Sequence, residues 1–165
     1  MAFQNTMNRV NTFGIQGDLA NGQEPHYTPT TPRVAADETI YAGDFVWVSD
    51  TNGVATCAKA SQSGKPTGIV QRTMDVALGC ADEASLQIPV GQKADVIVWG
   101  DVFVKTTDTA SVGKKLFVNN TTGAITCGTA GASVSGATET DWTVVSLANN
   151  TAGVSGSVVI ASNVK

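Results

Sequence analysis

Hydrophobic and polar positions alternate most clearly in a segment that occurs twice in this chain, at residues 42–57 and 112–127. The two copies align without a gap, and six of their sixteen positions are identical. Each copy places a short run of β-prone residues before a polar turn that contains glycine, and a second short run after it. This pattern is typical of a β-hairpin, and Asn52-Gly53 in the first copy is the stronger turn signal. The repeat therefore predicts one hairpin unit used twice.

The first strand of each hairpin has two predicted faces, because side chains alternate along a strand. One face is apolar in both copies, with Val46 and Val48 in the first copy, and we expect it to face the core. The other face carries Phe45 and Trp47 in the first copy, whereas the second copy begins that face with Lys115. We therefore expect Phe45 and Trp47 to meet something specific to the first copy. The alternatives are local packing under a loop and a contact with another subunit.

Further short strands are predicted between and after the two copies. The longest signal spans residues 94–105, where four valines fall on one face and are expected in the core. Gly100-Asp101 within it indicates a bend or bulge where the strand leaves one sheet for another. Residues 74–84 favour a loop with at most a short helix, and the Gly/Ala/Ser/Thr-rich residues 127–141 favour a mobile, exposed loop. The other short strands are expected at residues 37–40, 67–73, 86–89, 142–147 and 157–161.

The whole pattern predicts an all-β fold of about nine or ten short strands, either a β-sandwich or a small, jelly-roll-like barrel. The two hairpin copies suggest a pseudo-symmetric arrangement with one copy in each half. We expect this β-domain to span residues 34–165.

Residues 1–33 have a different composition and are expected to form an extended N-terminal arm. Three of the five prolines lie here, and no helical or strand period holds for long. Such a segment cannot build a core of its own, so the alternatives are a disordered tail and an arm that inserts side chains into a neighbour. The spaced apolar residues favour the arm, because burial against a partner would offset an ordering cost on the order of 1–2 kcal/mol per residue. The candidate partner-binding side chains are Phe3, Val10, Phe13, Ile15, Leu19 and Tyr27.

Composition and charge narrow the functional classes. The chain has 165 residues, of which 15% are charged, and a net charge of −4, so nothing indicates a basic surface for nucleic acid. No apolar run is long enough to predict a membrane span, and the first residues lack the pattern of a secretory signal. The three cysteines show no CxxC spacing, which indicates neither a zinc site nor a disulfide framework. Cys57 and Cys127 are expected to be free thiols in a protein made in a reducing cytoplasm.

Candidate catalytic residues are sparse. The single histidine, His26, lies in the proline-rich segment, which is a poor setting for a catalytic triad. The acidic residues do not cluster in sequence, and no phosphate-binding glycine loop is present. We therefore expect no enzyme, no metal and no cofactor. Trp47, Trp99 and Trp142 could form a sugar-binding platform, although tryptophans in strands belong more often to a core or an interface.

The order of the motifs resembles the structural cement, or capsid decoration, proteins of tailed bacteriophages. The resemblance covers roughly residues 10–127, and its motifs are IYAGDFVWV from residue 40, GIVQRT from 68, IPVGQKADVIVWGDVFV from 88 and VGKKLFVNNTTGAIT from 112. It implies a non-enzymatic structural virion protein that binds the outer surface of the capsid and cements neighbouring major capsid protein subunits. It also implies self-association, as a homotrimer or a dimer, and a location on the virion surface after synthesis in the host cytoplasm.

Under this hypothesis the arm contacts major capsid protein or an adjacent cement subunit. A chain that lacks residues 2–32 is then expected to fold but to lose binding to shells. The alternative is a head-fibre or tail-associated β-domain that binds a host glycan or receptor. An exposed aromatic row would favour that alternative, whereas buried tryptophans would favour cement. A third reading, a polysaccharide-degrading enzyme, needs two convergent carboxylates in a cleft.

Overall fold

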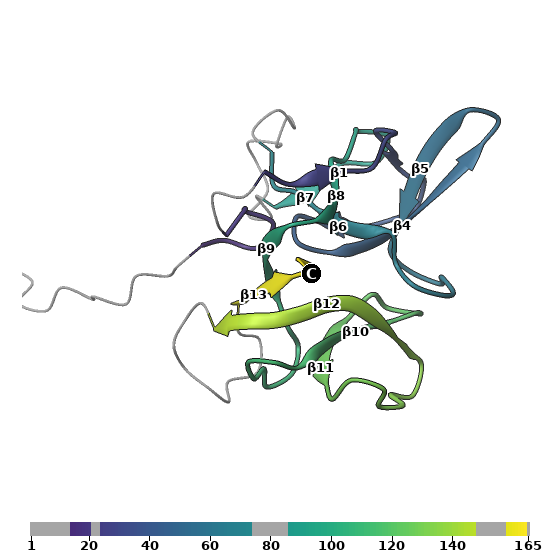
Figure 1. The fold of residues 1–165 in the computed structure, drawn as a ribbon. Helices are drawn as coiled ribbons and strands as arrows, with labels where there is room; N and C mark the ends of the chain where they lie inside the picture. The colour runs from purple at the N-terminus through teal and green to yellow at the C-terminus, as the bar shows by residue number, and fades with distance from the viewer. Residues whose placement is uncertain (1–13, 21–23, 74–85, 148–157, 165) are drawn as a thin grey trace, which may run out of the picture.

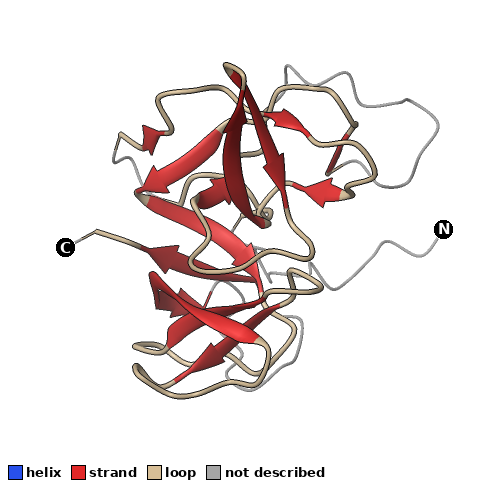
Figure 2. Cartoon of the chain, turned by 90° about the vertical axis from the view of Figure 1, so that its right-hand side faces the viewer, coloured by secondary structure: helices blue, strands red, loops and turns tan. Residues whose placement is uncertain are grey.

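The computed structural model describes residues 14–20, 24–73, 86–147 and 158–164, which form three β-sheets (Figure 1). Strands and loops account for all of these residues, and no helix occurs among them (Figure 2). The predicted all-β sandwich is confirmed, and the sheets do not close into a barrel. The described residues contain thirteen strands, more than the nine or ten predicted, because four of the strands are only two residues long.

The larger sheet has six strands in the order β1-β8-β6-β4-β5-β2. Their bounds are β1 (His26–Tyr27), β8 (Val96–Trp99), β6 (Gly68–Val70), β4 (Phe45–Thr51), β5 (Val54–Ala58) and β2 (Arg33–Val34). Neighbouring strands are antiparallel except β2 and β5, which are parallel. Arg33 of β2 also forms an isolated bridge with Lys93, shortly before β8, so the sheet curls toward itself.

The second sheet has five antiparallel strands in the order β11-β10-β12-β13-β9. Their bounds are β11 (Ile125–Gly128), β10 (Lys115–Asn119), β12 (Ala137–Leu147), β13 (Val158–Ser162) and β9 (Asp101–Lys105). A separate two-stranded sheet pairs β3 (Ile40–Tyr41) with β7 (Gln87–Ile88). Figure 1 shows the five-stranded sheet below the six-stranded one, with one hairpin copy in each.

The chain crosses from one sheet to the other at Gly100, between β8 and β9. The φ angle of Gly100 is 137°, a conformation that residues with a side chain rarely adopt. Because of this bend, Ile97 before it and Val102 and Val104 after it all face the same core, although a straight strand would put Ile97 on the opposite face. The predicted change of sheet is confirmed. The predicted single row of core valines is wrong, because Val96 packs in a different cluster.

Buried side chains form two clusters, and β4, β6 and β8 contribute to both. The larger cluster lies between the two main sheets and consists of Phe45, Trp47, Ile69, Ile97, Val102, Val104, Ala110, Leu116, Val118, Ile125, Trp142, Val144, Val159 and Ala161. The smaller cluster lies within the curl of the six-stranded sheet and consists of Val34, Ile40, Val46, Cys57, Val70, Ile88, Ala94 and Val96. Strands buried on both faces read as continuous hydrophobic runs, as these three do.

The two repeated hairpins present opposite faces to the larger cluster. In β4 the side chains that face it are Phe45 and Trp47, whereas in β10 they are Leu116 and Val118. Val46 packs instead in the smaller cluster. The expectation that the equivalent face serves one core in both copies is therefore corrected. The curl of the six-stranded sheet supplies a second core for the other face of β4.

The turns of the two hairpins also differ. Asn52 and Gly53 both have positive φ angles, 56° and 77°, which is the type I′ geometry of a two-residue turn. Thr122 stands at the repeat position of Asn52, and a β-branched residue strongly disfavours positive φ. The second ladder is shifted by two residues and the turn spans residues 120–123. The Oδ1 atom of Asn119 stabilises it by accepting hydrogen bonds from the backbone N–H groups of Thr121 and Thr122, at 2.9 and 3.0 Å.

The segment before residue 34 is part of the domain wherever the structure describes it. Residues 14–20 lie along β9, where the N–H of Gly17 donates to the carbonyl of Phe103 at 2.7 Å and the N–H of Phe103 donates to the carbonyl of Asp18 at 3.0 Å. β1 and β2 extend the six-stranded sheet. Residues 14–20 and β1 therefore pack on the β-domain predicted to begin at residue 34. A chain that lacks residues 2–32 would lose the bonds of residues 14–20 to β9 and the pairing of β1 with β8, so we do not expect it to fold normally.

Two predicted loops have different outcomes. The loop predicted for residues 127–141 is partly strand, because β11 continues to Gly128 and β12 begins at Ala137. Within β12 the hydroxyl of Thr140 donates to the carbonyl of Leu116 at 2.9 Å, which secures this buried polar residue. The loop predicted for residues 74–84 lies outside the described residues.

Replacing Gly68 by alanine tests the close approach of β6 and β8. A Cβ atom at Gly68 would overlap the carbonyl oxygen of Ile97, and that backbone atom can move only if the two strands separate. We expect Gly68→Ala to lower the free energy of unfolding by about 3 kcal/mol in urea denaturation. Gly131→Ala is the control, because its Cβ would meet nothing within 4 Å and only its φ of 74° costs about 1 kcal/mol. An equal decrease in the free energy of unfolding of the two variants would contradict the predicted overlap at Gly68.

Candidate functional site

The candidate arm residues that the structure describes differ in exposure and in their contacts. Ile15 is exposed beside the edge of β9, whereas Leu19 is partly buried, packs on the larger core cluster and bridges to Val102. Tyr27 is exposed on β1, and its hydroxyl donates to Oε1 of Gln71 at 2.7 Å. Leu19 therefore contacts its own chain. The remaining candidates lie outside the described residues: Phe3, Val10 and Phe13.

Phe45 and Trp47 lie inside the protein. Phe45 is fully buried and packs edge-to-face on Trp142, with 6.2 Å between the ring centroids. Trp47 is 9% exposed, and its Nε1–H donates to the carbonyl of Gly64 at 3.1 Å, so the loop after β5 covers it. Of the two sequence alternatives, the structure shows local packing under a loop. The possible subunit interface at these two residues is corrected, because neither side chain is available at the surface.

The start of the described chain is fixed to the edge of the five-stranded sheet. The Nη1 atom of Arg72 pairs with Oδ1 of Asp18 at 3.1 Å, and the backbone N–H of Arg72 donates to the carbonyl of Gly17 at 2.9 Å. Gly17 lies so close to Ala42 that an added Cβ would come within 2.7 Å of the Ala42 methyl carbon. Gly14 lies directly against the ring of Phe103. Gly14, the first described residue, therefore lies at a defined point beside β9.

A cavity of about 520 Å³ lies where the turn of the second hairpin meets the segment after the first. The Nζ atom of Lys59 pairs there with Oδ2 of Asp44 at 2.7 Å, and both side chains are mostly buried. Burial raises the pKa of Asp44 although Lys59 favours its charged form. The backbone N–H of Gln62 donates to the carbonyl of Asn120 at 2.8 Å. These contacts tie the two halves together and leave the central charges of the cavity paired.

Three further features bear on the candidate sites: metal ligands, membrane-spanning helices and the tryptophans. No group of three or more His, Cys, Asp or Glu side chains among them could hold a metal ion. Within the same residues, no helix is long and apolar enough to cross a membrane. Trp47 and Trp142 are buried and Trp99 is half-buried against His26, with 4.7 Å between those ring centroids. The three tryptophans thus do not form an exposed row.

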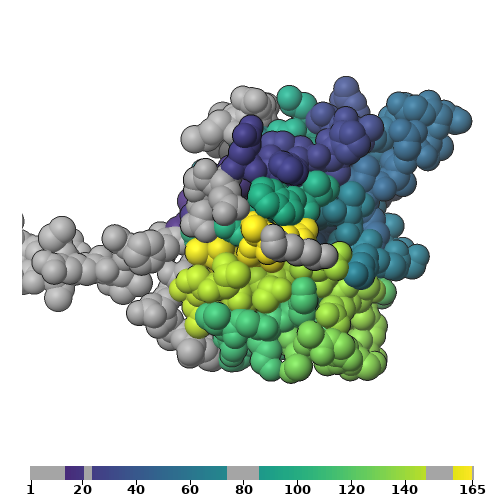
Figure 3. Space-filling view, in the orientation of Figure 1, coloured from purple at the N-terminus to yellow at the C-terminus, as the bar shows by residue number. Residues whose placement is uncertain are grey.

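The most prominent surface feature is the outer half of the first hairpin. Residues 49–54 are all exposed, and this tip projects from the body of the molecule at the upper right of Figures 1 and 3. Sequence reasoning found the turn but assigned it no role, because the turn motif itself says nothing about whether a neighbour covers the hairpin.

A comparison with protein-family models identifies the class. The model described as "XM1 gp53 minor capsid protein" matches residues 3–162, which is nearly the whole chain. The chain belongs to this minor capsid protein family. The predicted class of phage structural capsid protein is therefore confirmed, whereas the cementing of capsid subunits stays a prediction.

A solved structure has a similar fold. It is a chain in "The capsid of Myoviridae Phage XM1", with a TM-score of 0.62 and 18% sequence identity, and the match covers 100% of this chain and 99% of that one. At this identity the likeness shows the fold alone. No protein with a curated description matches the sequence.

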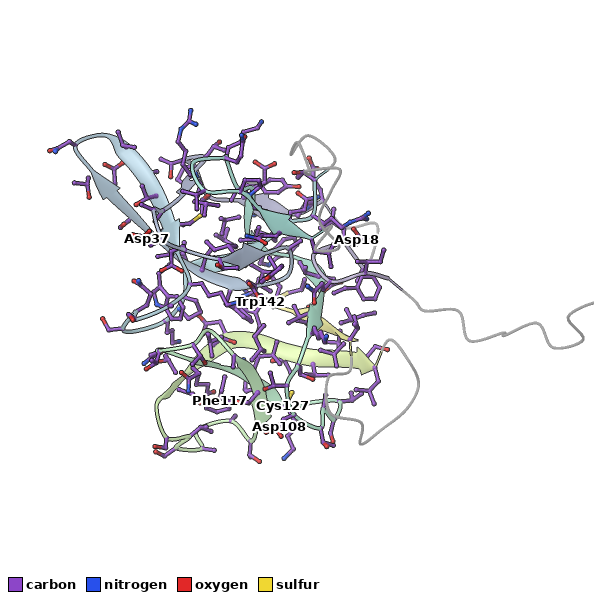
Figure 4. The ribbon with its side chains drawn as sticks, turned by 180° about the vertical axis from the view of Figure 1, so that it is seen from behind. Asp18, Asp37, Asp108, Phe117, Cys127 and Trp142 are labelled. Carbon is purple, nitrogen blue, oxygen red and sulfur yellow. The ribbon has the colours of Figure 1, made fainter. Side chains whose placement is uncertain are left out.

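The two described cysteines are free, and the structure predicts that they react slowly. Burial raises the pKa of both thiols from the ordinary 9.0 to about 11, and nearby Asp108 adds to the effect at Cys127 (Figure 4). In a Cys80→Ser variant, we expect Cys57 and Cys127 to resist a thiol-disulfide reagent at pH 8 until the protein is unfolded, because the thiolate is the reactive form. Rapid labelling of the native variant would contradict this.

The raised thiol pKa values also predict how stability depends on pH. Because the pKa values of Cys57 and Cys127 are higher in the folded than in the unfolded state, the free energy of unfolding should be retained below pH 9 and decrease as the pH rises toward 11.

Proposed function

We propose that this protein binds the outer surface of a phage capsid and cements neighbouring major capsid protein subunits. The proposal rests on the attachment of residues 14–20 to β9 and Arg72 in a chain of the minor capsid protein family. These contacts fix the first described residues, from Gly14, at one edge of a folded domain. The sequence before them, residues 1–13, contains Phe3, Val10 and Phe13 and no acidic residue. A short apolar segment on a rigid support can reach a neighbouring subunit, and burial there would offset the cost of ordering it.

The rest of the domain suits a scaffold role. Its buried residues form two continuous clusters, and its central charged pair, Lys59 with Asp44, is engaged within the chain. Weak contacts that repeat over a lattice can give strong binding through avidity, so each copy needs only modest affinity. Self-association as a homotrimer, or as a dimer, would add to this avidity.

The alternative of a glycan- or receptor-binding head-fibre or tail domain has less support. An exposed aromatic row would favour it, but Trp47 and Trp142 are buried. The aromatic residues of β1 and β8, His26 and Tyr27 beside Trp99, form only a small group at a sheet edge. Buried tryptophans favour the cement role.

Deleting residues 2–13 tests the proposal without disturbing the described fold. The deletion keeps Gly17, Asp18 and their bonds to β9 and Arg72, so the melting temperature should change by no more than a few degrees. We expect the full-length protein to co-sediment saturably with shells that lack it and to protect them against heat, and the deletion variant to bind at least about tenfold more weakly.

A full-length variant with Phe3, Val10 and Phe13 replaced by serine separates apolar contact from chain length. It should bind as weakly as the deletion variant. Full binding by both variants would refute the arm contact, and failure of the unmodified protein to bind shells would refute cementing and direct the search to glycan arrays.

A further inference from the structure

The tip of the first hairpin, residues 49–55, is supported by the rest of the described chain only at Ala55, where β2 pairs with β5. In β4 the side chains change from buried to exposed at Ser49, and in β5 Val54 is 54% exposed. Elsewhere the tip is held by its own ladder, by the type I′ turn, and by a hydrogen bond from the N–H of Gly53 to Oδ1 of Asp50 at 2.9 Å. A two-stranded hairpin of this kind is marginally stable alone.

Both edges of the tip have free backbone groups. From outside, the hairpin is supported on the β4 side as far as the bond from Val48 N–H to the Thr67 hydroxyl, at 3.0 Å, and on the β5 side by the parallel pairing of Arg33 and Val34 with Thr56 and Cys57. Backbone groups on an antiparallel strand point alternately to the paired strand and away from it. Two residues nearer the turn, Asp50 and Ala55 therefore direct their N–H and C=O groups outward. The register of β2 on β5 joins the Ala55 carbonyl to the N–H of Arg33, whereas no described residue pairs with the N–H of Ala55 or with the N–H and C=O of Asp50.

The second hairpin shows what the equivalent turn does when a partner is present. The backbone N–H groups of Ser61 and Gln62 donate to the carbonyls of Thr121 and Asn120, at 3.3 and 2.8 Å. Gly123 lies against the side chain of Lys59. One copy of the unit thus accepts backbone hydrogen bonds from a neighbouring segment of its own chain, while the other copy is bare.

We propose that the bare tip pairs by strand addition with an extended segment of a neighbouring shell protein. This inference rests on the proposed function and names a second contact for it. Proteins usually protect an exposed strand edge with lysine, proline or a covering loop, and residues 49–55 contain no lysine and no proline. Main-chain pairing would supply affinity, and the exposed side chain of Val54 would add an apolar contact.

A second copy of this chain fits the tip less well than a shell protein does. The segment that receives the second hairpin, residues 59–62, is already occupied by that hairpin in every copy. The partner therefore has to bring a free strand edge, and because Asp50 is the tip's one charged residue, that edge should be neutral or basic.

The test compares Ala55→Pro with Ala55→Val in shell co-sedimentation. Proline removes the outward N–H of residue 55 and leaves the bonds to β4 in place, whereas valine keeps that N–H and adds similar bulk. We expect Ala55→Pro to bind about tenfold more weakly and Ala55→Val to bind like the unmodified protein. A second pair, Val54→Lys and Val112→Lys, places a charge at the tip and at a valine that is 61% exposed elsewhere; only the first should weaken binding.

The possible outcomes separate this inference from the proposed function. If the unmodified protein binds shells and Ala55→Pro binds equally well, strand addition is refuted while cementing stands. Equal weakening by Ala55→Val would also refute it, and so would a loss of self-association in the free Ala55→Pro protein, which would assign the tip to a second copy. In the bound state we expect slower amide hydrogen exchange at residues 49–55, and unchanged exchange there would contradict the docking.

Discussion

The shared core between the two main sheets depends on the backbone bend at Gly100. The bend lets one continuous stretch of chain supply Ile97 to one sheet and Val102 and Val104 to the other, with all three side chains in the same cluster. The carbonyl of Gly100 accepts a hydrogen bond from the N–H of Asn163 at 3.2 Å, so the last described residues fix the crossing point. Without the change of face at Gly100, the valines of β9 would point away from the core that they complete.

The two hairpins share one sequence pattern but lie in different environments in the structure. The second turn is drawn into the junction between the sheets, where it contacts Lys59 and the segment that follows it. The first turn keeps the tighter Asn52-Gly53 geometry and extends into solvent. The same sequence unit is therefore packed against the rest of the domain in one copy and projects from it in the other.

The N-terminal region contains an irregular segment, residues 14–20, that is held at a sheet edge by backbone hydrogen bonds. Residues 14–20 show little alternation of hydrophobic and polar residues. Their conformation is fixed by backbone hydrogen bonds to β9 and by the ion pair of Asp18 with Arg72. Such bonds leave almost no signature in side-chain composition. The described part of this segment, residues 14–20, is therefore bound by its own chain.

The sequence by itself determined the all-β class, the two hairpins, the change of sheet at Gly100 and the scarcity of catalytic groups, since alternation, turn residues and residue types are local properties. It also indicated the phage capsid class through the order of its motifs. Only the tertiary structure decided which face of each hairpin is buried, because the curl of the six-stranded sheet creates a second core that encloses Val46. It likewise decided that Phe45 and Trp47 are internal and that the first hairpin tip is bare, because burial depends on which distant segments pack against a strand.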